Sequence, residues 1–417
     1  MLNTNVIKML IQKFFIVKPQ MAWFRVALMA LGITFVSNSF AQTDSIALNN
    51  RKIVLTGKTH GALPFLKYGP GADRLGGAKM TYLDTTILLQ IIDSLKDDYI
   101  VRLSKNHEAL IPKENVLFIP AVKRPDYYLT SSWKVSGDEK YDYVSVGLDE
   151  RLPYKSLQLI DPSRIVIDIY GATGNTNWIT QLKSAKEIRN VYHEQIEDDV
   201  FRVTIELKHA QQWGYSINYK GKSLVIAVKR QPDRLRLNHL KIAIDAGHGG
   251  TNSGAIGAKS GVKEKDCNLQ IAKELARYLK RRGAEVYMTR SSDVDLSMVD
   301  RTLMLRTAKP DLLISIHHNS ADNPTIKGVS TYYRYIGFKP LSVTILNRML
   351  ELDLAEFGNI GSFNFSLNGP TEYPNCLVEV AFLSNEADEK RITDPQFQQQ
   401  VAKRIRKGVL DWIKLAK

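Results

Sequence analysis

The sequence predicts a multidomain protein in which two all-β modules precede a three-layer α/β domain with a mostly parallel sheet. The chain has 417 residues, which is more than one hydrophobic core usually organises. Apolar and polar residues alternate through much of residues 49–230, as in half-buried strands. From residue 240 onwards, short apolar strands alternate with helical patterns, and this order indicates parallel strands joined by helices.

The first 41 residues have the features of a secretory signal peptide. Residues 1–42 contain four basic residues and no acidic residue, and an apolar run follows Arg25. Ser39 and Ala41 fit the small-residue rule for a signal-peptidase site. The alternative is a retained membrane anchor, but the apolar run is shorter than the roughly 20 residues that span a bilayer. We therefore expect cleavage near Ala41 and a periplasmic protein.

The charge of the chain limits the classes of partner. The formal net charge is +14, and loss of the four basic leader residues lowers it to +10. This charge favours acidic partners such as cell-wall polymers or anionic membrane surfaces. No arginine-rich block or RNA-binding signature is visible, so nucleic acid is not an expected partner. No membrane association is expected after signal cleavage.

The cysteine content argues against a disulfide framework, because Cys267 and Cys376 are the only two cysteines. A disulfide bond between them is the alternative in an oxidising compartment. Two buried thiols are the expected arrangement.

Residues 49–124 are expected to form a small β-barrel. Short strand patterns such as "YIVRL" are separated by turns, and a glycine-rich loop runs from Gly69 to Gly77. The stretch "DDYIVRLSKNHEALIPKENV" resembles the end of a bacterial SH3-like domain, where a strand, a turn and a short return strand close the barrel. The resemblance implies an SH3-like β-barrel.

Residues 127–230 continue with strands such as "RVTIEL" and "LVIAV", and "NYKGKSL" predicts a hairpin turn. The stretch "LQLIDPSRIVIDIYG", with Pro162, Arg164 and Asp168, resembles the AMIN domain, as do "IRNVYHEQIEDDVFRVTIEL" and "YSINYKGKSLVIAV". The resemblance implies a β-sandwich that binds peptidoglycan or a cell-wall or division-site protein. The alternative is a spacer. A polar stretch at residues 231–239 is the expected linker.

Residues 240–417 contain strand ends that carry chemically reactive side chains. In open α/β sheets such residues gather where strands end. "IAIDAGHGG" ends in His248, "LLISIHHNS" contains His317, and "CLVEVAF" contains Glu379. Glu264 is expected on the loop that opens a helix. Two imidazoles and one carboxylate are a common ligand set for catalytic zinc, with one position left for water.

Two neighbours compete with these candidates. Asp266 could replace Glu264 as a ligand, or it could cap the helix that follows. His318 competes with His317, but successive strand side chains point to opposite faces, so only one of them can face a metal ion. The glycines around His248 allow close backbone packing and positive φ angles.

Ordered motifs between residues 241 and 413 closely resemble the zinc-dependent N-acetylmuramoyl-L-alanine amidases of the Amidase_3 family. They are "IDAGHGG", "GAIG", "KEKDCNL", "RTLMLRTA", "LLISIHHNS", "GVSTYY" and "CLVEVAFLSN". The resemblance makes His248, Glu264 and His317 the ligands of Zn²⁺ and Glu379 the catalytic acid/base. The chain departs from the family at Asn252 and Ser253, where an acidic residue and proline are usual. Asn252 can orient a neighbour by hydrogen bonding but supplies no negative charge.

The resemblance implies hydrolysis of the amide between the lactyl group of N-acetylmuramic acid and L-alanine in peptidoglycan. Zinc-activated water would attack, with Glu379 as general base. Two alternatives stay open: another zinc peptidase that cuts stem-peptide bonds, and a non-catalytic peptidoglycan-binding protein with an amidase fold. The stretch between "GVSTYY" and "CLVEVAF" is too short for a large inserted blocking helix, which makes a dedicated activator less necessary.

Overall fold

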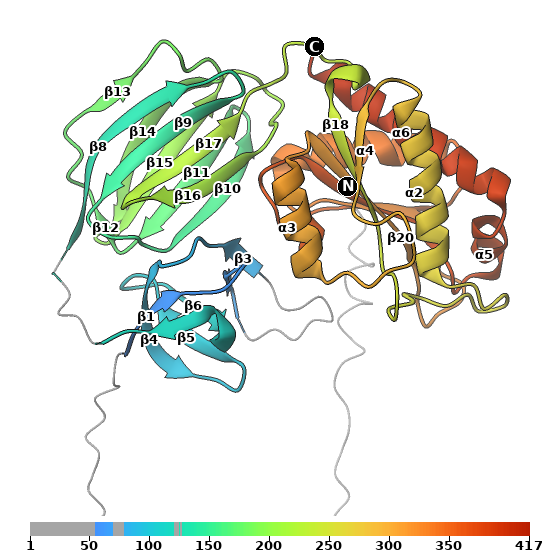
Figure 1. Cartoon of the computed structure of the whole chain (residues 1–417), viewed down its shortest axis with the longest axis horizontal. Helices are drawn as coiled ribbons and strands as arrows, with labels where there is room; N and C mark the ends of the chain where they lie inside the picture. Colours follow the sequence, from blue (N-terminus) through green and yellow to red (C-terminus); the bar gives the residue numbers. More distant parts are fainter. Residues whose placement is uncertain (1–54, 70–78, 121–124, 126) are drawn as a thin grey trace, which may run out of the picture. The chain divides into compact units, whose positions relative to one another are not determined.

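The computed structural model describes residues 55–69, 79–120, 125 and 127–417. The expected signal peptide and most of the glycine-rich loop lie outside these residues. Figure 1 shows the described chain as two all-β regions followed by one region of strands and helices. Within the described residues, no helix is both long and apolar enough to cross a membrane.

The first region is an antiparallel sheet in the strand order β3-β2-β6-β5-β4-β1-β7. The stretch that resembles the end of an SH3-like domain forms β5, a turn and β6. Its elements are β1 (Leu55–Thr59), β2 (Phe65–Lys67), β3 (Lys79–Tyr82), β4 (Leu88–Ser94), β5 (Asp98–Arg102), β6 (Glu108–Pro112), η1 (Lys113–Asn115) and β7 (Val116–Phe118).

The second region consists of two sheets that share a hydrophobic core. One sheet has the order β10-β11-β15-β14, and the other has the order β12-β8-β9-β17-β16 with β13 beside β8. The strands are β8 (Tyr128–Gly137), β9 (Tyr141–Leu148), β10 (Tyr154–Ile160), β11 (Ser163–Tyr170), β12 (Ala172–Thr173), β13 (Ile179–Gln181), β14 (Ile188–Glu197), β15 (Val200–Leu207), β16 (Tyr215–Lys220) and β17 (Ser223–Lys229).

Two features of this region follow from its sequence. The predicted hairpin is confirmed, because Lys220 pairs with Ser223 and the turn between them contains Gly221 with a φ of 63°. Asp168, from the pattern that resembles the AMIN domain, lies opposite Arg202 on the neighbouring strand. The Arg202 guanidinium donates to both Asp168 oxygens, at 2.6 and 2.9 Å. This bidentate pair ties β11 to β15.

The third region has one sheet in the order β19-β18-β20-β23-β21-β22, whose neighbours are parallel except for the antiparallel pair of β21 and β23. Its strands are β18 (Lys241–Ala246), β19 (Glu285–Met288), β20 (Leu312–Asn319), β21 (Val329–Tyr332), β22 (Glu356–Ile360) and β23 (Asn375–Phe382). Its helices are α2 (Glu264–Lys280), α3 (Met298–Ala308), α4 (Lys339–Leu350), α5 (Glu386–Ile392) and α6 (Pro395–Leu415), with 3₁₀ turns η2 (Leu237–His239), η3 (Ile336–Phe338) and η4 (Ser366–Asn368).

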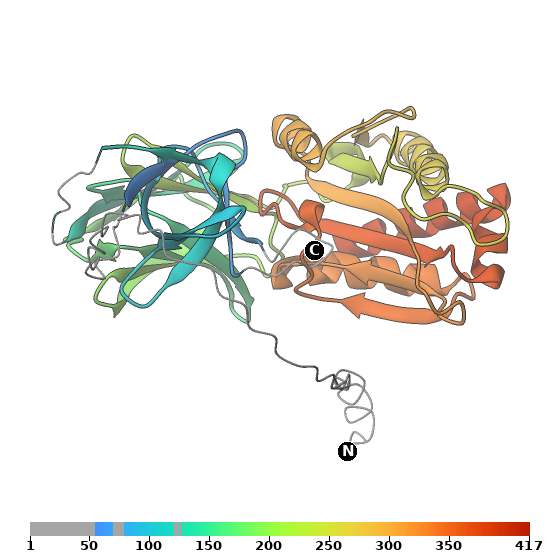
Figure 2. The ribbon, with the colours of Figure 1, turned by 90° about the horizontal axis from the view of Figure 1, so that it is seen from below.

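Helices of this region pack on both faces of the sheet, as Figures 1 and 2 allow the reader to follow. Ile242 and Ile244 of β18 join the core that is shared with α2, α4 and α6. Ala243, between them, joins a smaller core with Leu305 of α3. Successive strand residues point to opposite faces, so a continuous apolar run such as that of β18 serves two helical layers.

The helix that carries Glu264 begins earlier than expected. Glu264 is the first residue of α2 rather than a loop residue, and Lys263 is its N-cap. The proposed capping role of Asp266 is wrong, since Asp266 lies within the first turn. Acidic residues in the first turn are nevertheless favourable there, because the helix dipole places partial positive charge at this end.

The cysteines are unpaired, as expected. Cys267 and Cys376 are buried and carry free thiols. Burial raises the pKa of Cys267 to about 12, which keeps this thiol protonated and unreactive at neutral pH.

Candidate metal centre and active site

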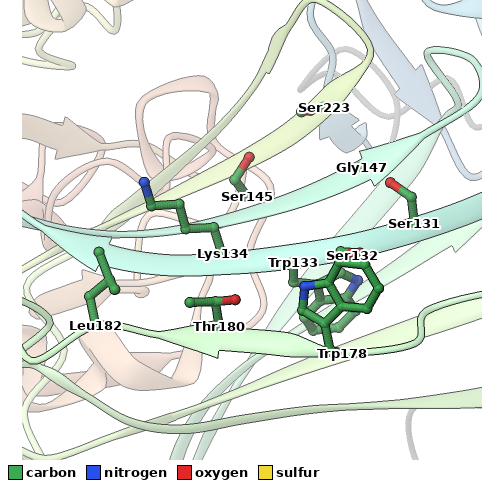
Figure 3. Close-up of a pocket in the computed structure, with 10 residues that line it drawn as sticks. All are labelled: Ser131, Ser132, Trp133, Lys134, Ser145, Gly147, Trp178, Thr180, Leu182 and Ser223. Carbon is green, nitrogen blue, oxygen red and sulfur yellow. The ribbon is translucent and has the colours of Figure 1, made fainter.

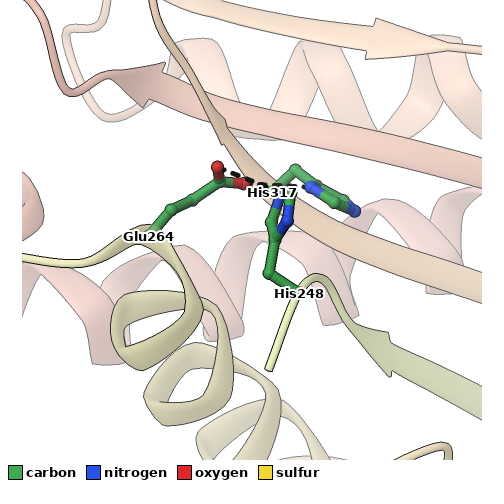
Figure 4. A group of neighbouring side chains, drawn as sticks. All are labelled: His248, Glu264 and His317. Atoms are coloured by element: carbon green, nitrogen blue, oxygen red, sulfur yellow. Dashed lines mark hydrogen bonds and ion pairs between the residues drawn. The ribbon is translucent and has the colours of Figure 1, made fainter. Parts of the chain in front are cut away.

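Two strand ends and one helix start meet at one edge of the third region's sheet. His248 lies two residues beyond the end of β18, His317 lies near the end of β20, and Glu264 opens α2. Figure 4 shows these three side chains pointing toward one another. Because β18 and β20 are adjacent and parallel, their carboxyl ends lie side by side.

The polar atoms of the three side chains lie close enough to share an ion. His248 Nε2 is 3.1 Å from Glu264 Oε2, and His317 Nδ1 is 3.0 Å from Glu264 Oε1. One ligand atom from each residue can be chosen so that all three lie within 4.8 Å of one another. The remaining described residues contain no other such group of three or more His, Cys, Asp or Glu side chains.

Asn252 fixes the orientation of His248. Its side-chain oxygen lies 2.9 Å from His248 Nδ1 and also accepts a hydrogen bond from the backbone N–H of Gly254 at 3.0 Å. Because this oxygen is an acceptor only, His248 Nδ1 carries a proton, and Nε2 is the nitrogen left to face Glu264 or, when a metal ion is bound, to ligate it. The orienting role suggested by the sequence therefore has a partner, His248.

Several hydrogen-bond donors hold the carboxylate of Glu264, which is buried and only 3% exposed. Its Oε2 accepts from the N–H of Ala255 at 2.8 Å. Its Oε1 accepts from the N–H of His318 at 3.1 Å and from Asn268 Nδ2 at 3.2 Å. These bonds position the carboxylate before any ion arrives, which is the arrangement that a second layer of residues around a metal site provides.

His318 points away from the metal-binding side chains and is packed rather than ligating. Its Nδ1 donates to Asn268 Oδ1 at 2.8 Å, and burial lowers its pKa to about 4. The choice of His317 over its neighbour agrees with this geometry. Sequence reasoning missed Asn268, although its position four residues after Glu264 on the same helix places the two on one face.

The loop after β18 is pinned by a buried ion pair that sequence reasoning also missed. Arg301 of α3 and Asp245 of β18 are each 1% exposed at the side chain and lie 2.5 Å apart. The Arg301 guanidinium also donates to the carbonyl oxygens of Ala246 at 2.9 Å and His248 at 2.6 Å. The backbone of His248 is therefore fixed from behind.

Gly247 is required by close contact with the second histidine. A β-carbon at this position would lie 2.1 Å from His317 Cε1, so any larger residue would displace the ring. His248 itself has a φ of 60°, and its neighbours Gly249 and Gly250 also have positive φ values. The predicted need for glycines here thus has two causes: ring packing and a left-handed backbone.

Glu379 lies beside the same centre. It is 7% exposed and is in direct register with His317 on the adjacent parallel strand β23. Paired residues of neighbouring strands project from the same face of a sheet. Both side chains line a cavity of about 1150 Å³ that also contains His248 and Glu264.

The lining of the cavity combines two kinds of side chain. Three of the lining residues, Tyr332, Phe363 and Phe365, pack their aromatic rings together with centroids 4.7 to 5.1 Å apart. The lining also includes two carboxylates, Asp295 before α3 and Asp300 in its first turn. A ligand in this cavity can therefore meet both aromatic rings and carboxylates.

The contacts among Glu264, His248 and His317 determine which of these side chains are charged when no metal ion is bound. Burial alone would raise the pKa of Glu264, but hydrogen bonds from His248 and His317 outweigh this effect and hold it well below its usual range. Burial likewise opposes the charged form of His317, whereas its bond to Glu264 and the charges of Glu264, Glu379 and Asp245 raise its pKa to about 9. The metal-free centre is thus an imidazolium–carboxylate pair.

The residues fit a zinc ion. The two imidazole nitrogens lie 3.1 and 3.0 Å from different oxygens of the Glu264 carboxylate. Imidazole nitrogen and carboxylate oxygen are both common ligands of zinc, and the three side chains are close enough to share one ion. Two imidazoles and one carboxylate also leave one position open, which distinguishes a catalytic site from a structural one.

Comparisons with known proteins agree with these observations. The profile of the family described as N-acetylmuramoyl-L-alanine amidase matches residues 242–411, and that of the AMIN domain matches residues 133–228. A crystal structure of an N-acetylmuramoyl-L-alanine amidase from Clostridium difficile 630 shares 32% identity, covers 42% of this chain and 97% of its own, and superposes with a TM-score of 0.41.

Two curated relatives define how far the likeness extends. The probable cell wall amidase LytH of Staphylococcus epidermidis is 33% identical over 169 residues, which are 40% of this chain and 56% of the relative. The chain thus spans little more than half of that relative's length. The germination-specific N-acetylmuramoyl-L-alanine amidase of Bacillus subtilis is 32% identical over 199 residues, covering 43% of this chain and 82% of the relative.

The matched segment contains His248, Glu264, His317 and Glu379, and the AMIN match lies inside the second all-β region. Both resemblances predicted from the motifs are therefore confirmed. With most of an amidase covered at this level of identity, the chain belongs to the N-acetylmuramoyl-L-alanine amidase family.

Proposed function

We propose that this protein hydrolyses the amide between the lactyl group of N-acetylmuramic acid and L-alanine in peptidoglycan. The observation that carries the proposal is the convergence of His248, Glu264 and His317 on one point, with Glu379 in register with His317 beside them. Three ligands and one neighbouring carboxylate are the set that metal-assisted amide hydrolysis requires.

His248, Glu264 and His317 would hold the ion, which we take to be Zn²⁺. When bound, zinc supplies Lewis acidity that stabilises developing negative charge and favours deprotonation of water at neutral pH. Asn252 and Asn268 keep the ligands oriented through the bonds described above. Arg301 keeps the His248 backbone in place.

Glu379 is the proposed acid/base. It takes the proton of the attacking water as the new carbon–oxygen bond forms at the lactyl carbonyl carbon. It then returns this proton to the nitrogen of L-alanine as the carbon–nitrogen bond breaks. A carboxylic acid and a free amine are formed, and the acid then loses its own proton to solvent. A single proton moves through Glu379, and neither serine nor cysteine acts as a nucleophile.

The AMIN region is proposed to bind peptidoglycan through a shallow trough on the outer face of β8 and β9, drawn in Figure 3. Its volume is about 520 Å³. Trp178, 62% exposed, stands at its side, and Ser131, Ser145 and Thr180 supply hydroxyl groups. An exposed ring beside small hydroxyls suits the apolar face and hydroxyl groups of a sugar. Lys134 adds a positive charge for an acidic group.

The remaining organisation is proposed from the sequence. Residues 1–41 would be the signal peptide that directs the chain to the periplasm, residues 49–124 an SH3-like β-barrel, and residues 127–230 the AMIN sandwich. Residues 231–239 would link these modules to the catalytic domain, residues 240–417. A cell-wall or division-site protein remains an additional candidate partner of the AMIN region.

Product analysis of digested peptidoglycan tests the proposed reaction. The amidase should release intact stem peptides that begin with L-alanine and should leave peptide-free glycan. Cleaved stem peptides would instead indicate a zinc peptidase. Absence of hydrolysis by protein loaded with zinc would favour a non-catalytic binding protein.

The proposed trough has its own test. Trp178→Ala should reduce co-sedimentation with purified cell-wall sacculi, whereas the matched control Tyr192→Ala, an exposed aromatic residue of β14 in the other sheet, should not. Equal loss in both variants would contradict the trough as the binding site.

A further inference from the structure

The outward surfaces of α2 and α6 carry a concentration of basic side chains that the proposed reaction does not use. Figure 1 shows these two helices as neighbours, and they pack against each other. One carboxylate, Glu274, occurs within residues 273–282 and 403–407. We call the following residues the basic patch: Lys273, Arg277, Lys280, Arg281, Arg282, Lys403, Arg406 and Lys407.

The patch is continuous across the two helices. The ring of Tyr278 on α2 lies 4.5 Å from the Arg277 guanidinium carbon and 5.6 Å from Lys403 Nζ of α6. Burial and the nearby positive charge of Arg282 both lower the pKa of Arg406, as expected for neighbouring like charges. The two helices therefore present a single basic surface with an aromatic ring between them.

Most of these charges lack compensation within the protein. Among the described residues, Arg277 is the one member of the patch that forms an ion pair, with Glu274. Lys273 and Arg277, like Lys403 and Lys407, are spaced four residues apart on a helix, where like charges repel each other. An anionic partner would relieve this repulsion.

The position of the patch relative to the metal centre indicates which partner fits. Helix α2 begins at Glu264 in the metal centre and has 17 residues, so its far end lies about 25 Å away at 1.5 Å per residue. Most of the patch belongs to that far end. A surface that binds the substrate polymer would be expected beside the cavity, whereas the basic patch lies at the opposite end of α2.

We propose that the basic patch docks the catalytic domain on an anionic phospholipid surface, with the cavity directed away from the membrane. Several long basic side chains on adjoining helices suit a layer of phosphate headgroups, and Tyr278 has the mixed character that suits the lipid–water interface. The inference rests on the proposed function in one respect: the polymer substrate is taken to lie on the side of the protein that faces away from the membrane. It revises the expectation that the chain has no membrane partner after signal cleavage.

Vesicle co-sedimentation tests the proposal with protein lacking residues 1–41. Phosphatidylglycerol vesicles should bind the protein at 0.1 M salt, and pure phosphatidylcholine vesicles should not. The variant Arg281→Gln, Arg282→Gln, Lys403→Gln, Lys407→Gln should bind several-hundred-fold more weakly, at about fivefold for each basic residue removed. The matched control removes four exposed charges elsewhere in the same domain: Lys309→Gln, Lys327→Gln, Lys339→Gln and Lys390→Gln.

The outcomes separate this proposal from its competitors. Equal weakening in both quadruple variants would mean that net charge alone acts, and failure of wild-type protein to bind phosphatidylglycerol would reject docking on lipid. Patch-dependent binding to poly(glycerol phosphate) without binding to vesicles would mean that the patch binds a wall polymer rather than lipid. This result would overturn the membrane assignment. Hydrolysis of soluble peptidoglycan fragments should be unchanged in the patch variant, so that failure of docking and failure of the proposed reaction remain distinguishable.

Discussion

His317 and Glu379 stand opposite each other in register on the adjacent parallel strands β20 and β23. This pairing sets one proposed ligand and the proposed acid/base on the same face of the sheet, one strand spacing of roughly 4.8 Å apart at the backbone. Neither residue depends on a flexible loop for its position. Strand register therefore places the proposed metal ligand and the proposed acid/base side by side.

Replacing Glu379 by Gln should abolish most catalysis while leaving metal binding intact. The amide keeps the size of the side chain but cannot accept and return a proton, so kcat should fall by about 10²–10⁴. Hydrolysis of peptidoglycan fragments and zinc content are the two measurements. Glu386→Gln, at an exposed position just beyond the same strand, is the matched control. Full activity of Glu379→Gln with zinc bound would remove Glu379 from the reaction.

Asn252 should control the affinity of the site for zinc. Without its oxygen, His248 loses the bond that fixes its proton on Nδ1, and loss of such a partner typically weakens metal binding 10- to 100-fold. Asn252→Ala should show this loss in competition with a chromophoric chelator. Asn252→Asp should bind zinc at least as tightly as the wild type, because a carboxylate makes the imidazole a stronger ligand. An alanine variant with unchanged affinity would show that Asn252 is not an orienting partner.

The same site shows which features a sequence can and cannot predict. His248, Glu264, His317 and Glu379 could be named because strand ends and motif order mark them. Asn268 lies one helical turn from Glu264, but the sequence does not show that its side-chain oxygen also bonds to His318 of β20. This second contact arises only once α2 is docked on the sheet.

Helix boundaries and buried ion pairs are likewise difficult to predict from the sequence. The start of α2 at Glu264 depends on the neighbouring loop, in which the N–H of Glu264 bonds to the carbonyl of Ala255. Asp245 and Arg301 are 56 residues apart and belong to different elements. No local pattern links them, so their pairing is fixed by the tertiary packing of α3 against β18.

Zinc binding should release a proton at neutral pH. His317 in the metal-free protein has a pKa raised to about 9 by its carboxylate neighbours, whereas Glu264 stays ionised because its pKa is lowered. The imidazolium must lose its proton to bind metal, so affinity should rise about tenfold per pH unit from pH 7 to about 9 and then level off. Calorimetry in buffers of different ionisation enthalpy should give about one proton released at pH 7 and none at pH 10. Release that did not change over this range would contradict the assigned protonation state.

The metal-free protein should show the opposite trend in stability. The raised pKa of His317 stabilises the folded state below its ordinary value of 6.5, and this contribution is lost as the pH rises toward 9. Urea unfolding with a chelator present should therefore give a lower free energy of unfolding at pH 9 than at pH 6.5 from this group. His317→Gln should flatten that part of the pH profile, and a profile unchanged by the substitution would exclude His317 as its source.

Removing one member of the Arg301–Asp245 pair should destabilise the catalytic domain. Arg301→Met leaves Asp245 buried without its cationic partner, a change that costs about 3–5 kcal/mol for fully buried pairs. Asp245→Asn combined with Arg301→Met should recover part of this loss, since the uncompensated charge is then gone. Chemical denaturation of the wild type and the variants measures both effects. If the double variant were no more stable than Arg301→Met, the cost would come from the lost bonds to the Ala246 and His248 carbonyl groups rather than from the buried charge.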